Sequence, residues 1–298
     1  MADLHPFLSI VIPTYNREKL ITKTLESVKS QTCQDFELII VDDGSTDNTS
    51  LAVKPYLNNS IKYFKKENGE RGAARNYGVT QSIGQYVTFL DSDDLLYTNH
   101  VEVARQFVNE HSGAKAFHSG YDIVSDTGET LGSQNCSGKN INRELLKGNL
   151  LSCIGVFLKR EVAIEFPFNE NRELSGSEDW ELWMRIGCHY DFLCTKKITA
   201  CMVQHDARSV VNIHHDAIVR RIHLAYDTVT SYPPFIEKYS ALSHFVKSHL
   251  FLYLSLHLAM SGRSRQSFYF LKKSVRASPF VFFSRKTMGI LKVMIGNL

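Results

Sequence analysis

The chain contains, at residues 86–94, the stretch Tyr-Val-Thr-Phe-Leu-Asp-Ser-Asp-Asp, in which an apolar run meets three acidic residues. A short apolar run rich in aromatic and β-branched residues is typical of a buried β-strand. Like charges this close repel one another unless a cation or hydrogen-bond donors compensate them, and carboxylate oxygens suit Mg²⁺ or Mn²⁺. A solvated acidic turn is the alternative, less favoured because the strand aims the acids into a crevice.

Three further β-rich runs precede this stretch, and helical patterns lie between them. We expect strands at 7–13, 36–41, 61–65 and 86–90, and helices at 19–30, 49–56, 73–81 and 99–110. This alternation is typical of βαβ units that build a mainly parallel sheet. Ligands of such sheets bind at the carboxyl ends of the strands. The sequence therefore predicts an α/β fold with its site where these runs end.

The second half of the chain has a weaker pattern followed by a helical region. Strand-like pieces occur near 153–158 and 199–203, and a short helix begins near Trp180. After residue 214 we expect helices at 216–230, 240–260 and 265–275, with a last segment from Phe280. We therefore predict one domain over 1–213 and a helical appendage over 214–298.

The composition is that of a globular protein with no extended disorder. Of 298 residues, 43% are hydrophobic and 22% charged, which allows one substantial core. No signal peptide is visible, and the apolar stretch 250–260 is short for a spanning helix. No CxxC pair occurs among the six cysteines, so we expect reduced, mostly buried thiols and a cytoplasmic protein.

The charge is unevenly distributed. Residues 261–298 carry eight basic residues and no acidic one, which leaves 26 basic against 31 acidic residues, or −5, for residues 1–260. Mixed with aromatic residues, this basic tail suits the surface of an anionic membrane. The alternative is an appendage that packs its aromatic residues on the domain. Nucleic-acid binding is disfavoured because the body is acidic.

Polar motifs follow the first two expected strands. The first is Pro13-Thr14-Tyr15-Asn16-Arg17, and the second is Asp42-Asp43-Gly44-Ser45. Acids at a strand end can accept hydrogen bonds from a base N–H or a ribose hydroxyl. For Asp47, further along, we favour a helix cap.

A glycine-rich turn between Gly69 and Gly78 opens the third helix. Arg71 and Arg75 lie one turn apart there, so the helix dipole and both guanidinium groups favour phosphate. The segment is not GxGxxG, which gives no support to a dinucleotide dehydrogenase.

Two later segments add candidates for catalysis. Glu178 and Asp179 begin a helix, where an acid near a substrate hydroxyl can serve as general base or simply cap the helix. Trp180 can stack on a sugar or belong to the core. His205, after the last strand, is a candidate for the metal or the diphosphate, or is structural.

In order, these motifs resemble family 2 glycosyltransferases over residues 7–210. The resemblance implies a GT-A fold, with a Rossmann-like mixed sheet flanked by helices, an inverting transfer and a nucleotide-diphosphate sugar donor, most often UDP-linked. It places the donor in 7–125 and the acceptor in 126–213. A sugar nucleotidyltransferase would need a glycine-rich basic signature that is missing after the first strand. A non-catalytic nucleotide-sugar or glycan-binding module is the other alternative.

The resemblance assigns roles to individual residues. For the nucleotide-sugar it implies Pro13, Tyr15, Arg17, Asp42, Asp43, Gly69, Arg71, Arg75, Asp91 and Ser92. For Mn²⁺ or Mg²⁺ it implies Asp93 first, then Asp91, Asp94 and His205; for the reaction, Asp179 as base with Glu178; for the acceptor, Trp180. The QxxRW motif of processive synthases is missing, which favours a single addition. By analogy with the family, we expect a glycan or lipid-linked acceptor and a role in surface polysaccharide assembly at the inner face of the plasma membrane.

Overall fold

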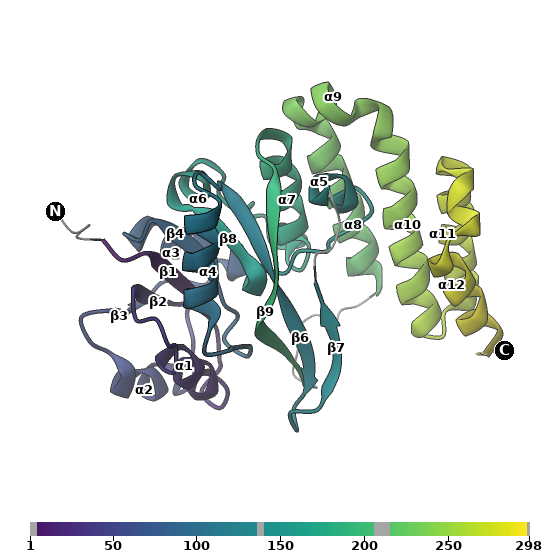
Figure 1. Ribbon diagram of the computed structural model, residues 1–298. Coiled ribbons are helices and arrows are strands. Elements are labelled where there is room, and N and C mark those ends of the chain that lie inside the picture. The colour runs from purple at the N-terminus through teal and green to yellow at the C-terminus, as the bar shows by residue number, and fades with distance from the viewer. Residues whose placement is uncertain (1–4, 136–139, 206–214, 297–298) are drawn as a thin grey trace.

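The computed structural model describes residues 5–135, 140–205 and 215–296, and within them nine strands form one mixed sheet (Figure 1). The strand order is β3-β2-β1-β4-β8-β6-β9-β5, and β7 pairs with β6 beside this path. The strands are β1 (Leu8–Thr14), β2 (Phe36–Asp42), β3 (Ile61–Lys65), β4 (Tyr86–Phe89), β5 (Leu95–Leu96), β6 (Ala116–Ser125), β7 (Thr130–Gln134), β8 (Val156–Lys159) and β9 (Phe192–Gln204).

The first four strands are parallel, and helices cover both faces of this part of the sheet. The helices of the first half are α1 (Ile21–Lys29), α2 (Thr49–Val53), α3 (Glu70–Gln81) and α4 (His100–Glu110). Because successive side chains of a strand point to opposite faces, Ile10 and Ile12 belong to the core that includes Leu25 and Val101, whereas Val11 belongs to the core that includes Ala74. The four expected strands are confirmed to within a residue at each end.

The second half extends the sheet with antiparallel pairs. β8 pairs antiparallel with both β4 and β6, and β9 runs parallel to β6. The helical elements here are α5 (Ile141–Leu145), α6 (Arg160–Glu165) and α7 (Glu178–His189). The sequence did not predict β6 or β7, and β9 is much longer than the expected 199–203.

Buried polar residues explain why β6 escaped prediction. His118 and Ser119 interrupt its apolar pattern, yet both are almost fully buried. The Ser119 hydroxyl lies 2.8 Å from Oγ1 of Thr199 on β9, and that same Oγ1 lies 2.9 Å from Nδ1 of His100 on α4. Hydrogen bonds between distant residues therefore allow a strand that local hydrophobicity does not indicate.

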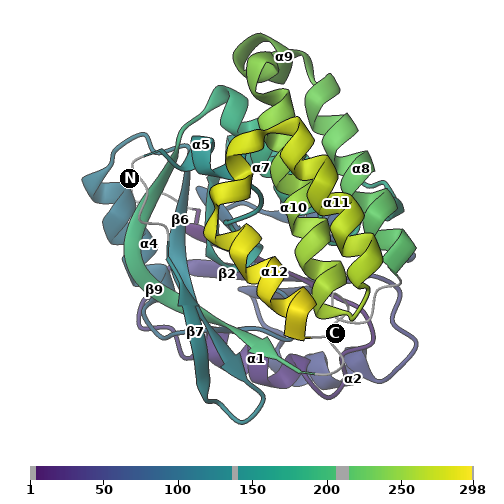
Figure 2. The same cartoon turned by 90° about the vertical axis from the view of Figure 1, so that its right-hand side faces the viewer.

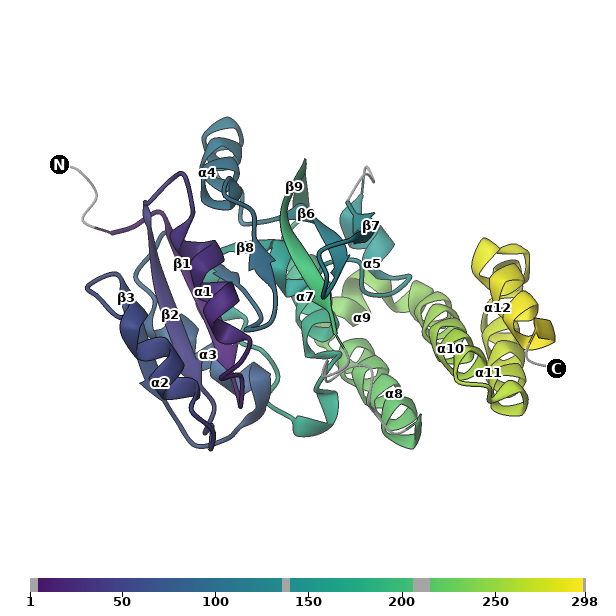
Figure 3. The ribbon, with the colours of Figure 1, turned by 90° about the horizontal axis from the view of Figure 1, so that it is seen from below.

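The C-terminal helices follow one another away from the sheet, with α11 and α12 outermost (Figures 1 and 3). They are α8 (His215–Ser231), α9 (Pro233–Tyr239), α10 (Ser243–Met260), α11 (Ser264–Ala277) and α12 (Arg285–Gly296). The main core continues from Trp183 on α7 into Ile218 on α8 and Val246 on α10. A separate small core joins α10 to α11 and α12.

Two expectations about the whole chain have clear outcomes. Within the described ranges, no helix is long and apolar enough to cross a membrane. Cys33, Cys153, Cys188 and Cys201 are free thiols. Cys194 is disulfide-bonded, so the expectation of reduced cysteines was wrong for it; Cys136 lies outside the described residues.

Gly78 lets α3 lie directly against β1. A Cβ atom built there would stand 2.3 Å from a methyl carbon of Val11. We predict that Gly78→Ala lowers the free energy of unfolding by about 1 to 3 kcal/mol, because an added methyl group overpacks the interface. Gly289→Ala is the matched control, since nothing lies within 4 Å of its Cβ position on α12. Equal urea-unfolding midpoints for the two variants would contradict this packing.

Candidate active site

A cavity of about 640 Å³ opens where β1, β2 and β4 end and where α3 and α7 begin. The lining comprises Pro13, Thr14, Tyr15, Arg17, Asp43, Asn68, Glu70, Arg71, Arg75, Asp91, Ser92, Asp93, Ser152, Cys153, Arg172, Gly176, Glu178, Asp179 and Met202. The fold thus brings to one cavity the motifs that follow three strands and the acid pair that begins α7.

Asp43 lies in this wall within a set of hydrogen-bond donors. Its Oδ1 accepts from Lys66 Nζ at 2.8 Å and from the backbone N–H of Gly69 at 2.9 Å. Asn68 Nδ2 donates to the other carboxylate oxygen at 3.1 Å. These bonds hold the Asp43 side chain in one orientation at the cavity wall. Gly69 itself supports Asp43 from behind and is not among the lining residues.

Asp42 has a different role from its neighbour. It is fully buried, accepts from the backbone N–H of Ser45 at 2.7 Å and makes a short hydrogen bond with the Tyr63 hydroxyl. Burial, and then the hydrogen bond to Asp42, raises the pKa of Tyr63 far above its usual value. Asp42 therefore fixes the turn after β2, and it lies outside the lining.

The turn after β1 is joined to the turn after β2. Asn16 adopts a φ of 52°, in the left-handed region that non-glycine residues seldom enter. Its N–H donates to Ser45 Oγ at 2.9 Å, and its Oδ1 accepts from the N–H of Thr46 at 2.9 Å. Tyr15, exposed, and Arg17 are thereby presented to the cavity from either side of Asn16.

The acids after β4 form a compact oxygen cluster. One carboxylate oxygen from each of Asp91, Asp93 and Asp94 lies within 4.8 Å of the others. Asp91 and Asp93 line the cavity with Ser92, whereas Asp94 is buried and its Oδ1 accepts from the backbone N–H of Val203 at 3.0 Å. Oxygen ligands of this type fit Mg²⁺ or Mn²⁺. Of the three, Asp91 and Asp93 thus face the space in which a ligand would lie.

The side chains of His205 and Arg17 both lie close to the Asp93 carboxylate. His205 Nε2 lies 3.2 Å from Asp93 Oδ2, and Arg17 Nη2 lies 3.6 Å from the same oxygen. His205 is outside the cavity lining but next to the cluster, as the metal hypothesis requires. The protein thus provides partial charge compensation around Asp93.

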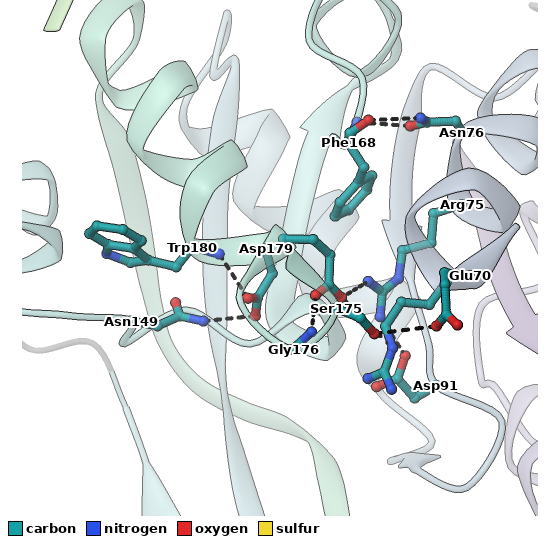
Figure 4. Close-up of polar contacts among 12 residues, drawn as sticks. Glu70, Arg75, Asn76, Asp91, Asn149, Phe168, Ser175, Gly176, Asp179 and Trp180 are labelled. Atoms are coloured by element: carbon teal, nitrogen blue, oxygen red, sulfur yellow. Dashed lines mark hydrogen bonds and ion pairs between the residues drawn. The ribbon is translucent and has the colours of Figure 1, made fainter. Parts of the chain in front are cut away.

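Arg75 lies at the centre of the site and is almost fully buried, with 2% of its side chain exposed. Its Nη1 donates to Glu178 Oε1 at 2.9 Å, and its Nη2 donates to Asp91 Oδ1 at 2.7 Å. The guanidinium group also lies 5.2 Å from the centre of the Phe168 ring. Figure 4 shows Arg75 reaching from α3 towards Asp91. Arg75 therefore joins the acids after β4 to the acid pair of α7.

Arg71 is placed differently from Arg75. Its side chain is 26% exposed, and its Nε lies 3.9 Å from Glu178 Oε1. Because Arg71 lines the cavity with more of its side chain in solvent, it is the better of the two candidates for a donor phosphate.

Glu178 and Asp179 are adjacent, but their pKa values are shifted in opposite directions. Burial acts to raise the pKa of Glu178, but Arg75 and Arg71 outweigh burial and hold that pKa below its usual range. Burial, and then the negative charge of Glu178, raises the pKa of Asp179 to about 6, although Arg75 opposes this. Asp179 is therefore the better proton acceptor of the pair near neutral pH.

The Asp179 carboxylate is held by two donors on its own side of the cavity (Figure 4). Its Oδ2 accepts from Asn149 Nδ2 at 2.7 Å, and its Oδ1 accepts from the backbone N–H of Trp180 at 2.7 Å. Two short bonds to one carboxylate restrict its rotation, so a proton can be taken only from a defined direction.

Trp180 does not reach the cavity. Its ring is 3% exposed, and its Nε1 donates to the carbonyl of Leu145 at 3.0 Å. Trp183 is likewise buried, with Nε1 on the carbonyl of Leu151. The core alternative thus describes both tryptophans, and the expected sugar-stacking surface of Trp180 is not found.

Several cavity residues were not singled out from the sequence. They are Thr14, Asn68, Glu70, Ser152, Cys153, Arg172, Gly176 and Met202. Glu70 begins α3 with a φ of 71°, and its carboxylate lies 3.3 Å from Ser175 Oγ and 3.6 Å from Arg172 Nη1. Thr14 lies inside the Pro13–Arg17 motif and Glu70 inside the turn between Gly69 and Gly78, but no local pattern marks Arg172.

Most strands of the sheet and part of the cavity lining lie in a region that matches one known protein family. Residues 9–164, more than half of the chain, match the family described as glycosyl transferase family 2. The chain therefore belongs to glycosyltransferase family 2.

Curated relatives carry names consistent with this family. An uncharacterized glycosyltransferase of Rickettsia conorii is 33% identical over 60% of this chain, although the match covers only 30% of that protein's length. The β-1,3-glucosyltransferase WfgD of Escherichia coli, named for UDP-Glc and GlcNAc-diphosphoundecaprenol, is 29% identical over 63% of this chain and 76% of its own. A GalNAc(5)-diNAcBac-PP-undecaprenol β-1,3-glucosyltransferase of Campylobacter jejuni is 34% identical over 61% of this chain and 60% of its own.

Solved structures agree on the fold. Staphylococcus aureus TarS 1–349 in complex with UDP-GlcNAc superposes with a TM-score of 0.60 at 19% identity, covering 94% of this chain and 92% of that one. The mannosyltransferase PcManGT of Pyrobaculum calidifontis, in complex with GDP-Man and Mn²⁺, gives 0.56 at 16% identity, covering 99% and 88%. The expected GT-A architecture is confirmed.

We expect the two acids that begin α7 to contribute differently to stability at pH 8. Glu178→Gln should lower the free energy of unfolding by on the order of 3 kcal/mol, because the buried Arg75 loses one of its two charged partners. Asp179→Asn should cause little loss or a gain, because the raised pKa of Asp179 means that folding disfavours its charged form.

Urea unfolding of both variants at pH 5 and pH 8 checks this prediction. The relative gain from Asp179→Asn should be smaller at pH 5, because the folded wild type then holds the Asp179 proton and no longer carries the buried charge. A large destabilisation by Asp179→Asn at pH 8 would contradict this account of the pair.

Proposed function

We propose that the chain moves a sugar from a nucleotide-diphosphate donor, most often UDP-linked, to an acceptor hydroxyl with inversion at the anomeric carbon. The observation that carries the proposal is the bridge made by Arg75, which holds Asp91 and Glu178 at one cavity. This bridge sets the acids after β4 and the Glu178–Asp179 pair on two sides of a single space, as a transfer between two substrates requires.

The donor would bind along the parallel strands. Asp43, after β2, offers a fixed carboxylate oxygen to a base N–H or ribose hydroxyl. Asp91 and Ser92 follow β4, on the other side of β1, and would contact the ribose or sugar. Arg71 supplies a guanidinium group for phosphate. Pro13, Tyr15 and Arg17 would form the wall beside the base.

A divalent cation fits the oxygen cluster after β4. Asp93, with Asp91, would hold Mn²⁺ or Mg²⁺, and His205 would support Asp93 from behind. The bound cation would neutralise charge on the nucleoside diphosphate as it departs. Asp94 would orient the turn through its bond to Val203 rather than contact the donor.

Asp179 would act as the general base of a single displacement. It would remove the proton from the acceptor hydroxyl while that oxygen attacks the anomeric carbon, so no covalent sugar–protein intermediate is needed. Glu178, kept ionised by Arg75, would raise the proton affinity of Asp179 and hold Arg75 in place. The pair thus divides structural and chemical roles between two adjacent acids.

We base the proposed acceptor and place of action on the names of two relatives. Two relatives are named for undecaprenol-linked substrates, so we infer a lipid-linked glycan acceptor and a role in surface polysaccharide assembly. The donor would occupy 7–125 and the acceptor 126–213 of a domain over 1–213. The enzyme would work from the cytoplasmic side, at the inner face of the plasma membrane.

Asp179→Asn should reduce kcat for transfer by about 10² or more, since general base catalysis contributes about 10² to 10⁴ in rate. The affinity for the donor should remain unchanged.

In the wild type, kcat/KM should fall as pH drops below about 6, because protonated Asp179 cannot accept the acceptor proton. Nucleotide release and product formation between pH 5 and 8 test both points. Transfer that survives Asp179→Asn nearly intact would remove Asp179 from the mechanism.

Asp93→Ala should abolish the metal-dependent part of donor binding, because it removes one of the two carboxylates of the oxygen cluster that face the cavity. Titration calorimetry with UDP-, GDP- and dTDP-sugars, with and without Mn²⁺, measures this and identifies the donor class. Asp126→Ala is the control, since Asp126 is an exposed acid outside the lining. Unchanged affinity of Asp93→Ala in the presence of Mn²⁺ would refute the metal assignment.

A further inference from the structure

α11 and α12 lie on the outer side of the C-terminal region (Figure 2). Several large apolar side chains of these two helices and of the turn between them are exposed. Phe280 and Phe283, in the short helical turn Pro279–Phe283 between α11 and α12, are 86% and 79% exposed. We define the aromatic–basic face by its exposed members: Phe268, Tyr269, Lys272, Arg276, Phe280, Phe282, Phe283, Arg285, Lys286, Met288 and Lys292. Large contiguous apolar exposure commonly marks an interaction surface.

These side chains are not core residues that lack a place to pack. Each of the three elements buries a different residue beneath the face, namely Leu271 on α11, Val281 in the connecting turn and Ile290 on α12. The alternative expectation, that the tail packs its aromatic residues inward, therefore describes Phe270, which is buried, but not Phe280 or Phe283.

The support beneath the face is held by buried serine pairs. The Ser248 hydroxyl donates to the Ser274 carbonyl at 2.9 Å, and the Ser274 hydroxyl donates back to the Ser248 carbonyl at 2.8 Å. Further along the same two helices, Ser255 of α10 and Ser267 of α11 make the same reciprocal bonds. α10 and α11 therefore pack closely, and the face is displayed on a defined support.

The charge of this region has one sign. No acidic residue follows Glu237 in the sequence, and short groups of basic residues lie between groups of aromatic ones. Lys272 Nζ lies 4.6 Å from the centre of the Phe268 ring, and Lys273 Nζ lies 4.6 Å from that of Tyr269. The cations thus lie against the rings that they accompany, so rings and charges would meet a partner together.

We propose that the aromatic–basic face contacts the surface of an anionic lipid bilayer, with Phe280 and Phe283 entering the boundary between headgroups and acyl chains. Aromatic rings with adjacent cations suit that boundary. With 14 and 12 residues, α11 and α12 are too short to span the bilayer. An acidic protein would complement the charge but not require so many exposed rings, so the bilayer is favoured.

The contact is mechanically connected to the active site. α11 and α12 pack on α10, α10 packs on α8, and Arg221 of α8 donates to the Ser175 carbonyl beside Gly176 of the cavity lining. The inference rests on the proposed function only in giving a lipid-linked acceptor a place; bilayer binding itself needs no sugar transfer.

Sedimentation of the full chain with vesicles tests the inference. The wild type should bind equimolar phosphatidylglycerol–phosphatidylcholine vesicles and bind pure phosphatidylcholine far more weakly. Phe280→Ser/Phe283→Ser should lower the partition coefficient at least about tenfold, because two apolar rings lose their burial in lipid. Lys272→Glu/Lys286→Glu should lower it by about 25-fold or more, since each basic residue near such a surface contributes roughly fivefold.

Leu51→Ser/Ile164→Ser provides the matched control, because both side chains are exposed apolar residues of the catalytic part, 63% and 52% exposed. Binding should be unchanged in this control. Equal binding of all variants, equal binding to neutral vesicles, or no binding would overturn the inference. So would a homodimer in solution that Phe280→Ser/Phe283→Ser dissociates, since the face would then be covered by a second copy.

Nucleotide release in solution separates this inference from the proposed function. The Phe280→Ser/Phe283→Ser variant should release nucleotide from a soluble donor as the wild type does. Vesicle binding by a chain that releases no nucleotide from any donor would leave the inference standing and count against the transferase mechanism. Nucleotide release without vesicle binding would do the reverse.

Discussion

The site depends on one buried cation. Arg75 has almost no exposed surface and donates to Glu178 and Asp91, two acids that reach it from different halves of the chain. A buried guanidinium group is costly unless its partners are in place, so the fold can bury Arg75 only when α3, the turn after β4 and α7 meet. The geometry of the cavity is therefore part of what stabilises the protein. Arg75 also keeps Glu178 ionised, and the charge of Glu178, together with burial, raises the pKa of Asp179.

Much of the first half could be predicted because its strands are buried on both faces. β1, β2 and β4 are buried along their whole length and mainly apolar, and the polar residues that follow them line the cavity as expected at Asp43, Asp91 and Asp93. β6 was missed because buried polar residues such as His118 break its pattern. The neighbouring buried Ser119 is hydrogen-bonded to Thr199, 80 residues along the chain, and a local window cannot detect such a partner.

The assignment of individual roles had the same limit. Sequence spacing set Arg71 and Arg75 as equal candidates for the donor. They differ in burial and in the bond that Arg75 makes to Asp91, and the Glu178 that helps to bury Arg75 lies 103 residues away. The sequence suggested Trp180 for the acceptor because a tryptophan ring can stack on a sugar, whereas the turn of α7 directs this ring into the core. Neighbours in sequence on a helix face different sides, so adjacency to a catalytic acid is weak evidence for contact with substrate.

The serine pairs between α10 and α11 give the C-terminal region an unusual tolerance of its surroundings. Salt screens ion pairs, and the strength of hydrophobic packing depends on the contrast with water. Hydroxyl groups that bond reciprocally to carbonyls are neutral and buried, so neither salt nor a change in the medium beyond the helices weakens them. A helical pair held in this way would keep its shape whether its outer side met cytoplasm, concentrated salt or lipid.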